Sequence, residues 1–497
     1  MNLIINRGLN ILNILRLLIQ RNFVFLWFVA ALALNLLAFL CWIPPVKAEN
    51  TDSTIQLINT GNTQTIMDTN FYDTEGVYTT FRRDTVNAKG TVSISLSGYL
   101  GLSAGQYTGQ SISEPNKAAG LVYGPGANRY GKGLDAYPVE SDPSSTACLP
   151  IVVRNLDGLN TMIRVMNTSE AAQNVDIFFY QSDGTLVSPT AYSTTVPGNA
   201  TWSVNLEREG AAIGIGDDFS GSARINGTDI LAVVAQLYTD DASSAYLAPL
   251  SSEAGTKGLA SSLYFPWVRR GTSGLTTKLY FRNIGTSSSN LLVSIRKLDG
   301  SLSAEEFLVL PNNGLSSIDL SSLTGLPDGE YSIETSSDQP TEAVALLQDN
   351  SKAMCAYSFS PTRIAMNLYV PFVKMGDGWS TSINIKNVSA MDLSFNYSFR
   401  NPEGSAVESG SVENFSPLVT VSLTPNLGTF EGAGTVEATN PISGVVLVKS
   451  PDGDFFSYPA TTEQGLGRLV MPHLIKNKSA VVKKISAPAI NLLLLGD

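Results

Sequence analysis

Residues Thr161–Asn167 read TMIRVMN, a threonine followed by alternating apolar residues and a closing asparagine. The same pattern, starting with Ser or Thr, recurs at Ser53–Asn59 (STIQLIN), Thr277–Asn283 (TKLYFRN) and Thr381–Asn387 (TSINIKN). Apolar residues at every second position indicate a strand that is buried on one face. Four copies of one strand signature therefore predict a tandem array of β-domains.

An acidic-glycine pair follows each copy at a constant distance. The offset from the asparagine to the glycine is the same in all four copies, from 59 to 76, 167 to 184, 283 to 300 and 387 to 404. An Asp-Gly pair supplies the positive-φ positions of tight hairpins, so each pair predicts a turn. The residues that define the repeat are therefore Asn59, Asn167, Asn283, Asn387, Gly76, Gly184, Gly300 and Gly404.

The second copy shows what the rest of a unit contains. Strand patterns continue at 175–180, 185–196, 201–206, 221–225 and 230–237, with turn residues between them and no helical period. Roughly seven or eight short strands per unit are typical of an immunoglobulin-like sandwich. We therefore expect an all-β chain of four tandem immunoglobulin-like β-sandwich domains after an N-terminal signal or anchor helix.

A strand ending in a hydrophobic-Pro pair recurs late in each repeat. The pairs are Leu149-Pro150, Phe265-Pro266, Val370-Pro371 and Met471-Pro472. Proline cannot donate to a sheet, so this strand is expected at an edge or a joint. We assign it to the end of each unit, which gives domains at 51–155, 158–272, 275–376 and 379–478. If it opened each unit instead, the last copy, Leu469–Ile475, could complete the first unit of another molecule.

The two ends of the chain differ from the repeats. Residues 1–48 contain a basic start, an apolar run at 23–43 and Val46-Lys47-Ala48, which has the spacing of a signal-peptidase site. They predict either a secretory leader cleaved between Ala48 and Glu49 or a retained membrane anchor. Both alternatives export the repeats. The tail, 479–497, predicts a terminal strand on the last domain, and a C-terminal sorting signal is the alternative.

Composition limits the classes of partner. The net charge is −11 with only 15% charged residues, and the leader contributes basic residues alone, so the exported part is more acidic still. An acidic surface disfavours nucleic acid and anionic lipid. Contact with a membrane is expected only through 23–43, if uncleaved. Cys148 and Cys355 fall in different repeats, which predicts buried or free thiols rather than a disulfide framework.

The combined pattern resembles the tandem immunoglobulin-like β-sandwich repeat proteins of bacterial cell surfaces. The resemblance rests on the hydrophobic-Pro strand followed by the Thr-to-Asn strand, seen at Leu149-Pro150 with Thr161–Asn167, Phe265-Pro266 with Thr277–Asn283, and Val370-Pro371 with Gly378–Asn387. It implies an exported, non-catalytic scaffold, and it supplies no functional residue to carry over.

The sequence contains few of the residue combinations that catalytic sites use. His473 is the single histidine and stands where the other copies have Ile151, Trp267 and Phe372, so we expect a packed side chain. Ser-His-Asp and Cys-His sites would both depend on this residue. Carboxylate pairs exist at Glu305-Glu306 and at Glu207 with Glu209, which leaves an exported carboxylate-dependent hydrolase as a remote alternative. The prediction is that the chain is not an enzyme and needs no cofactor.

Binding residues are sought in loops and exposed aromatic side chains. The enlarged 123–147 and 239–262 loops are candidate binding loops, with Tyr123, Tyr137 and Tyr246 as their markers. The alternative is a repeated tyrosine that bonds to backbone. Calcium is a minor alternative at acidic turns, namely Asp217-Asp218, Asp240-Asp241 and Asp452-Gly453-Asp454.

The sequence thus predicts an extracellular or surface-attached scaffold for adhesion, spacing or surface-layer or filament assembly. The expected partners are other surface proteins, envelope polysaccharide or further copies of the chain. A glycan-binding module array of the cell envelope is the main alternative, with Trp379 and the late-loop tyrosines as its test residues.

Overall fold

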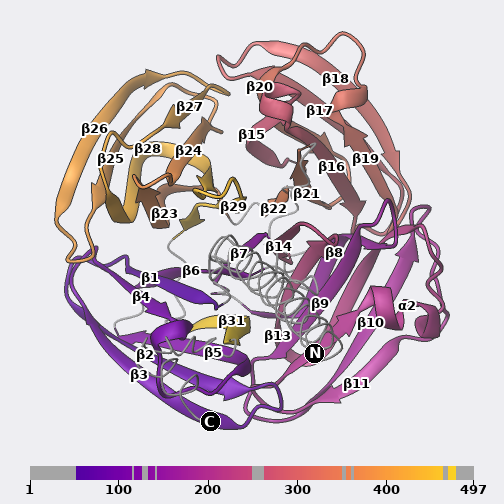
Figure 1. Ribbon diagram of the computed structural model, residues 1–497. Coiled ribbons are helices and arrows are strands. Elements are labelled where there is room, and N and C mark those ends of the chain that lie inside the picture. The colour runs from indigo at the N-terminus through magenta and orange to yellow at the C-terminus, as the bar shows by residue number, and fades with distance from the viewer. Residues whose placement is uncertain are drawn as a thin grey trace, which may run out of the picture. The chain divides into compact units, whose positions relative to one another are not determined.

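The computed structural model describes residues 52–114, 117–125, 133–139, 141, 143–248, 262–349, 354–359, 363–462 and 468–476. Strands form nearly all the regular structure in these ranges, so the predicted all-β class is confirmed (Figure 1). The predicted leader, the bond between Ala48 and Glu49, and the tail 479–497 lie outside the described residues. Within the described ranges, no helix is long and apolar enough to cross a membrane.

The first unit consists of two four-stranded sheets. Their strand orders are β4-β1-β6-β7 and β3-β2-β5-β31. The strands are β1 (Thr54–Asn59), β2 (Thr65–Asp73), β3 (Tyr78–Val86), β4 (Thr91–Ser95), β5 (Gly105–Glu114), β6 (Ala118–Pro125), β7 (Leu134–Pro138) and β31 (Arg468–Lys476), with the short helix η1 (Leu96–Gly98) after β4.

The third unit repeats this arrangement. Its sheets have the orders β15-β20-β17-β18 and β19-β16-β21-β22. The elements are β15 (Tyr264–Arg270), η2 (Thr272–Gly274), β16 (Thr276–Asn283), β17 (Ser289–Lys297), β18 (Leu302–Leu310), β19 (Leu315–Asp319), η3 (Leu320–Ser322), β20 (Gly329–Ser337), β21 (Thr341–Gln348) and β22 (Met354–Phe359).

In the second and fourth units, one long strand contributes to both layers. The first half of β13 (Phe219–Tyr238) pairs with β8 and β10, and its second half pairs with β9 and β14. The other strands of the second unit are β8 (Ser144–Arg154), β9 (Asn160–Asn167), β10 (Gln173–Gln181), β11 (Tyr192–Val196), β12 (Thr201–Asn205) and β14 (Ser243–Leu247).

The fourth unit has the same pattern, with β28 (Phe430–Lys449) as its long strand. Its other strands are β23 (Ala365–Met375), β24 (Ser380–Asn387), β25 (Leu393–Arg400), β26 (Ala406–Phe415), β27 (Thr420–Leu423), β29 (Phe455–Pro459) and β30 (Thr461–Thr462).

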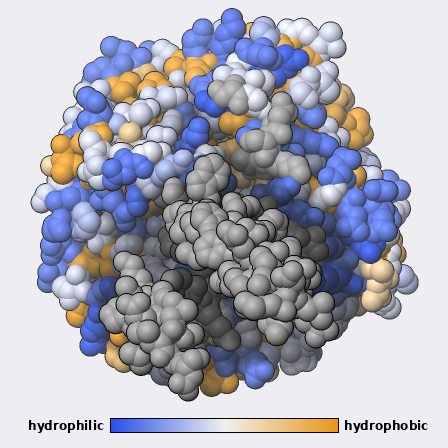
Figure 2. Space-filling view, in the orientation of Figure 1, coloured by the Kyte–Doolittle hydropathy of each residue, from blue (hydrophilic) through white to orange (hydrophobic). Residues whose placement is uncertain are grey.

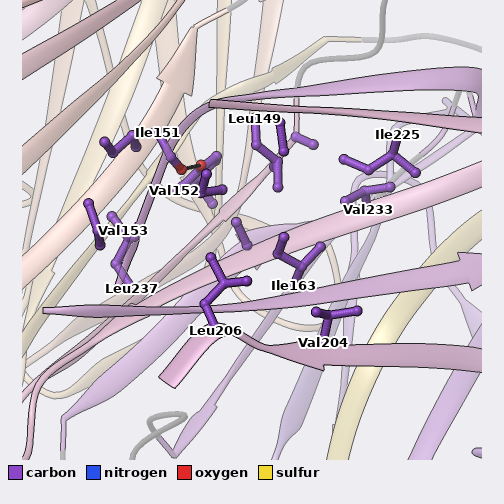
Figure 3. Packing of buried hydrophobic residues seen from close by; sticks show 14 of the residues in the cluster. Leu149, Ile151, Val152, Val153, Ile163, Val204, Leu206, Ile225, Val233 and Leu237 are labelled. Atoms are coloured by element: carbon purple, nitrogen blue, oxygen red, sulfur yellow. Dashed lines mark hydrogen bonds between the residues drawn. The ribbon is translucent and has the colours of Figure 1, made fainter. Parts of the chain in front are cut away.

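Each unit has its own core between its two layers. In the second unit, Leu149 on β8 and Ile225 on β13 belong to the same buried cluster as Ile163 on β9 and Val204 on β12 (Figure 3). Every one of these side chains is fully buried. Burying a Leu or Ile side chain contributes about 1.5–3 kcal/mol, so packing between the layers is the main stabilising term within a unit.

The single α-helix of the described residues, α2 (Leu206–Ile213), was not expected from the sequence. Its start and end follow ordinary capping rules. The Asn205 side chain accepts the backbone N–H of Arg208, and Gly214 ends the helix with φ of 89°. Glu207 and Glu209 lie in its first turn, where acidic side chains interact favourably with the helix dipole.

The hydrophobic-Pro strand opens a unit and does not close the preceding one. β8 pairs with β13, β15 with β20, and β23 with β28, and each partner lies later in the chain. The predicted domain limits at 155, 272 and 376 had placed these strands with the preceding unit, so the pairing corrects them. The sequence pattern located the strands, but the choice of sheet depends on contacts formed far along the chain.

Proline explains the local shape of these strands. The ladder register shifts around Pro150, Pro266, Pro371 and Pro472, between the pairs that flank each of them. Proline has no N–H to donate, so the sheet accommodates it as a bulge. β15 and β31 also lie at the edges of their sheets, as expected for this strand.

The last copy of this strand pairs with the first unit of the same chain. β31 runs antiparallel to β5, with Leu469 opposite Ser111 and Met471 opposite Gly109. The late strands β7, β14, β22 and β29, one from each unit, also contact one another in a closed cycle (Figure 1). The repeats from Thr51 onward therefore form one compact body in which the fourth unit meets the first.

Candidate functional site

The four repeat-defining asparagines stabilise the turns inside their own units. The Asn167 Nδ2 group donates to the carbonyls of Ala171, Val196 and Pro197, at 2.7, 3.0 and 3.0 Å. Its Oδ1 accepts the backbone N–H of Ser169 at 3.0 Å. Asn59, Asn283 and Asn387 bond in the same way at their own turns. These buried side chains pair backbone groups that would otherwise lack partners.

The four repeat-defining glycines have positive φ, between 84° and 88°, as the turn prediction required. They also lie at the joints between units. A Cβ on Gly76, Gly184 or Gly404 would come under 3.0 Å from a backbone carbonyl of the next unit, namely that of Gly198, Asn312 or Ala88. A Cβ on Gly300 would lie 3.3 Å from the Val419 side chain. The glycine therefore lets one hairpin lie directly against the turn of its neighbour.

A backbone hydrogen bond accompanies each of these contacts. Thr201 donates to the carbonyl of Thr74 at 3.2 Å, Leu315 to Ser182 at 2.9 Å, and Thr420 to Leu298 at 2.7 Å. The fourth joint completes the series, because Thr91 of the first unit donates to Pro402 of the fourth at 2.9 Å. The same hairpin-to-turn contact thus joins units 1 to 2, 2 to 3, 3 to 4 and 4 to 1.

The joint between units 2 and 3 contains a buried pair of charged residues. Arg282 is fully buried, donates to the Ala223 carbonyl at 2.6 Å and lies 5.1 Å from the centre of the Tyr180 ring. Glu342 is its register partner on the adjacent strand. Burial raises the pKa of Glu342 to about 8, although Arg282 acts in the opposite direction. Among the described residues, the Arg282 Nε and Nη2 atoms and the Glu342 Oε2 atom have no hydrogen-bond partner, so the two side chains face each other without a direct hydrogen bond.

The joint between units 3 and 4 uses a buried lysine at the same strand position. The Lys386 Nζ atom donates to the Ser332 hydroxyl at 2.9 Å and to the Leu418 carbonyl at 2.8 Å. Burial lowers the pKa of Lys386 to about 8, and Glu334 partly offsets this effect. The other two joints are apolar at this position, with Met166 and Ile58 in place of the charged residues.

A polar network lies where β31 meets the first and second units. Arg164 donates to the Gln236 side chain at 2.7 Å, and Gln236 donates to Asp135 at 2.5 Å. Tyr137 donates to the backbone carbonyl of His473. His473 itself is buried, and its Nε2 atom has no hydrogen-bond partner among the described residues. Burial and the nearby Arg164 guanidinium hold the pKa of His473 well below its usual value.

The tyrosines that marked the candidate binding loops are packed inside the protein. Tyr137 and Tyr246 are buried, and their hydroxyls donate to the carbonyl that follows the proline of an opening strand. Tyr357 and Tyr458 make the equivalent bond. Tyr123 is partly buried; its ring stacks on Phe456 of the fourth unit at 5.7 Å and packs at a tilt against Phe372 at 4.8 Å, measured between ring centres. The backbone-bonding alternative therefore describes the repeated tyrosine, and loop residues 126–132 and 249–261 lie outside the described part.

Trp379, the tryptophan named as a glycan test residue, and Trp202 both have local contacts. Lys374 lies 4.9 Å from the centre of the Trp379 ring, and Tyr192 packs on Trp202 at 5.2 Å. On the face shown in Figure 2, hydrophobic residues lie in separate small patches among hydrophilic ones.

The acidic candidates are dispersed. Glu305 and Glu306 are neighbours on β18, so their side chains point to opposite faces, and Glu305 accepts the Ser294 hydroxyl at 3.1 Å. Glu207 accepts the Tyr238 hydroxyl, and Glu209 accepts that of Tyr192. In the described residues, no group of three or more His, Cys, Asp or Glu side chains converges to hold a metal ion. Asp217, one of the calcium candidates, pairs with Arg154 at 2.8 Å.

The two cysteines of the repeats are not joined in a disulfide, as predicted. Cys148 on β8 and Cys355 on β22 are both buried and belong to different units. The joints, and not a disulfide framework, therefore hold the units together.

Comparison with known proteins finds one family match and no activity. The description "Family of unknown function (DUF5719)" matches residues 131–367, which is less than half of the chain. None of the curated proteins matches the sequence.

Several solved structures are similar over parts of the chain. A Thermotoga maritima protein, 1070, is 16% identical over 21% of this chain and 95% of its own, with a TM-score of 0.18. The Anabaena sensory rhodopsin transducer is 19% identical over 19% of this chain and 96% of its own, with a TM-score of 0.17. A tetra-tandem repeat from the extending region of a large adhesion protein is 12% identical over 84% of this chain and 98% of its own, with a TM-score of 0.11. At such TM-scores these likenesses support no conclusion about function.

Proposed function

We propose that the chain is an exported, non-catalytic repeat scaffold of the bacterial cell surface, used for adhesion, spacing or surface-layer or filament assembly. One observation carries the proposal: the residues that recur in all four repeats hold turns and joints. The asparagines bond backbone within each unit, and the glycines allow each unit to contact the next. The residues that recur in all four repeats thus have structural roles and supply no reactive group.

The joints favour a block with fixed surfaces over a flexible string of domains. Each joint combines a backbone hydrogen bond with side chains that are buried between two units, such as Arg282 and Lys386. Interfaces that bury such groups resist bending, because separating the units would leave polar atoms without their partners. Other surface proteins, envelope polysaccharide or further copies of the chain would meet the exposed loops of this block.

The finer assignments belong to the same proposal. Export rests on the apolar run at 23–43 and the Val46-Lys47-Ala48 site that follows it. The immunoglobulin-like assignment rests on two layers that share one core in each unit. The sequence predicted seven or eight strands per unit, and the first and third units have eight, four in each sheet.

Fractionation of the cells that make the protein tests the proposal. We expect an N-terminus at Glu49 with protein in the medium or in a large assembly, or an intact N-terminus in the membrane fraction with the repeats open to external protease. Repeats protected inside intact cells would contradict export. Polysaccharide hydrolysis by the purified protein that is lost in Glu305→Gln but kept in the exposed-site control Glu403→Gln would contradict the non-catalytic role.

A further inference from the structure

The opening strand of the first unit is connected differently from the other three. In the second, third and fourth units it passes through a short turn, 155–159, 271–275 or 376–379, into the next strand of the same unit. In the first unit, the opening strand β31 begins at residue 468, whereas the next strand, β1, begins at residue 54. No short turn therefore ties β31 to the strand that follows it in the other units.

The site that receives β31 is built for an apolar strand. Leu469, Met471 and Leu474 are buried in the core of the first unit. Gly109 on β5 leaves space for two of them, since a Cβ there would come 2.9 Å from Met471 and 3.1 Å from Leu474. Without β31, the edge of β5 and this apolar surface would both be exposed, which is the situation that favours addition of a strand from another chain.

Polar contacts fix the position of β31 along β5. Ser53 donates its backbone N–H to the Ile475 carbonyl at 2.8 Å, and Ile475 donates to the Ser53 hydroxyl at 2.8 Å. Arg468 donates to the Gln110 side chain, and the Thr201 hydroxyl donates to the Pro472 carbonyl at 2.9 Å. These contacts specify one register, whichever molecule supplies the strand.

β31 also carries a weak point that the other opening strands lack. His473 occupies the position of Ile151, Trp267 and Phe372, and its buried Nε2 atom has no hydrogen-bond partner in the part of the chain that the structure describes. The charged or titratable groups around it are Arg164 on β9 and Asp135 and Tyr137 on β7. Its own strand carries Arg468 and Lys476 at the two ends. A buried polar atom without a partner destabilises this strand relative to its apolar counterparts.

We propose that β31 is an exchangeable donor strand, and that the partner it fits is a second copy of this chain, in which it pairs with β5 of the first unit. Exchange would replace every contact of the closed chain by the same contact between two chains. Strand exchange of this kind is a low-cost route to oligomers, because it needs no new interface. The inference deepens the assembly role proposed above.

Two variants of the full chain, each with one added cysteine, test the exchange. Ile475 lies opposite Gln106 and bonds to Ser53 on its other side, so the pair is a non-hydrogen-bonded one. The Cα atoms of such a pair are about 4.5 Å apart, within the range of a disulfide. Ile475→Cys and Gln106→Cys chains are mixed, incubated at pH 5.0 or 7.5, returned to pH 7.5 and oxidised. A disulfide between positions 475 and 106 of two chains, identified by peptide mass, requires exchange.

The expected result is an interchain product that forms faster at pH 5.0. The free imidazole has a pKa of 6.5, and that of buried His473 is well below this value. Opening at pH 5.0 should therefore exceed opening at pH 7.5 roughly 30-fold, because protonation of an exposed imidazole of pKa 6.5 stabilises the opened state at the lower pH. His473→Phe, which copies Phe372, should slow the exchange and remove its dependence on pH.

The double variant Gln106→Cys/Ile475→Cys is the matched control and should cross-link within one chain. The proposal is overturned if the double variant cross-links internally while mixed single variants give no interchain product at either pH. Failure of the double variant would also overturn it, since that result contradicts the pairing of β31 with β5. Because the test uses purified chains, either failure leaves export and the scaffold role to be decided by cell fractionation.

Discussion

Replacing Gly184 by alanine should weaken the joint between units 2 and 3 more than it weakens either unit. Gly184 has φ of 85°, and a Cβ there would lie under 3.0 Å from the Asn312 carbonyl oxygen. The left-handed conformation costs a non-glycine residue about 1–2 kcal/mol. Relieving the clash by displacing the hairpin costs about 1–3 kcal/mol in disturbed packing. Loss of the Leu315-to-Ser182 hydrogen bond adds about 0.5–1.5 kcal/mol. The total is roughly 2.5–6.5 kcal/mol.

Gly158 provides the matched control. It has φ of 78°, but no atom lies within 4 Å of the position its Cβ would take. Gly158→Ala should therefore cost only the conformational part, about 1–2 kcal/mol. Urea unfolding followed by tryptophan fluorescence gives the two free energies, and limited proteolysis at 181–185 and 311–314 reports whether the joint has opened. Equal losses for the two variants, with no earlier cleavage in Gly184→Ala, would refute the role assigned to the repeat glycine.

Three further predictions concern the repeat and its joints. Asn167→Ala removes three buried hydrogen bonds and should lower the free energy of unfolding by about 2–4 kcal/mol, measured by urea titration; a loss below about 1 kcal/mol would contradict the role of the asparagine. Tyr458→Phe should cost about 1–2 kcal/mol through the unpaired Phe372 carbonyl, while the exposed-site control Tyr78→Phe should cost almost nothing; equal effects would argue against the tyrosine bond. Glu342 has a pKa of about 8 in the fold and 4.5 as the free side chain. Between these pH values the folded state therefore binds more protons than the unfolded state. The free energy of unfolding should fall as the pH rises from about 4.5 to 8. Glu342→Gln should flatten this slope in thermal melts, and an unchanged slope would assign it to another group.

The sequence predicted the strands and turns well, because their signals are local. Alternation along Thr161–Asn167 and the Asp183-Gly184 turn depend on neighbouring residues alone. The role of Gly184 at a joint could not be predicted in the same way, since the carbonyl it faces belongs to Asn312 in another unit. The constant offset from the asparagine identified the position, but only the packed structure shows what the position contacts.

The sequence also underestimated how far the Thr-to-Asn strands are buried, again because their burial depends on residues of another unit. Alternation predicts one polar, solvent-facing side for each Thr-to-Asn strand, yet every residue of β1 is buried, and so are Arg282 and Lys386. The second face of these strands is covered by the neighbouring unit, which no local pattern encodes. Helix α2, in contrast, had a readable signal: Asn205 as N-cap, acidic residues in the first turn and Gly214 as C-cap.

The unit boundaries show where local patterns end. Edge strands such as β8 and β31 have the same composition whether they close one sheet or open the next. Their assignment depends on which sheet edge is free, and for β31 that edge is on β5, more than three hundred positions away in the chain. Loop closure over such a distance is a property of the whole fold.

Small-angle X-ray scattering of the monomeric repeats in solution tests the central claim, that the four units form a closed array. A compact body of about 430 residues should have a radius of gyration of about 22 Å. Four units in an extended line, each a domain with a radius of gyration of about 13 Å, would give roughly twice the compact value. The compact value for protein of monomer mass is the result predicted from closure of β31 on β5, and the extended value would contradict that closure.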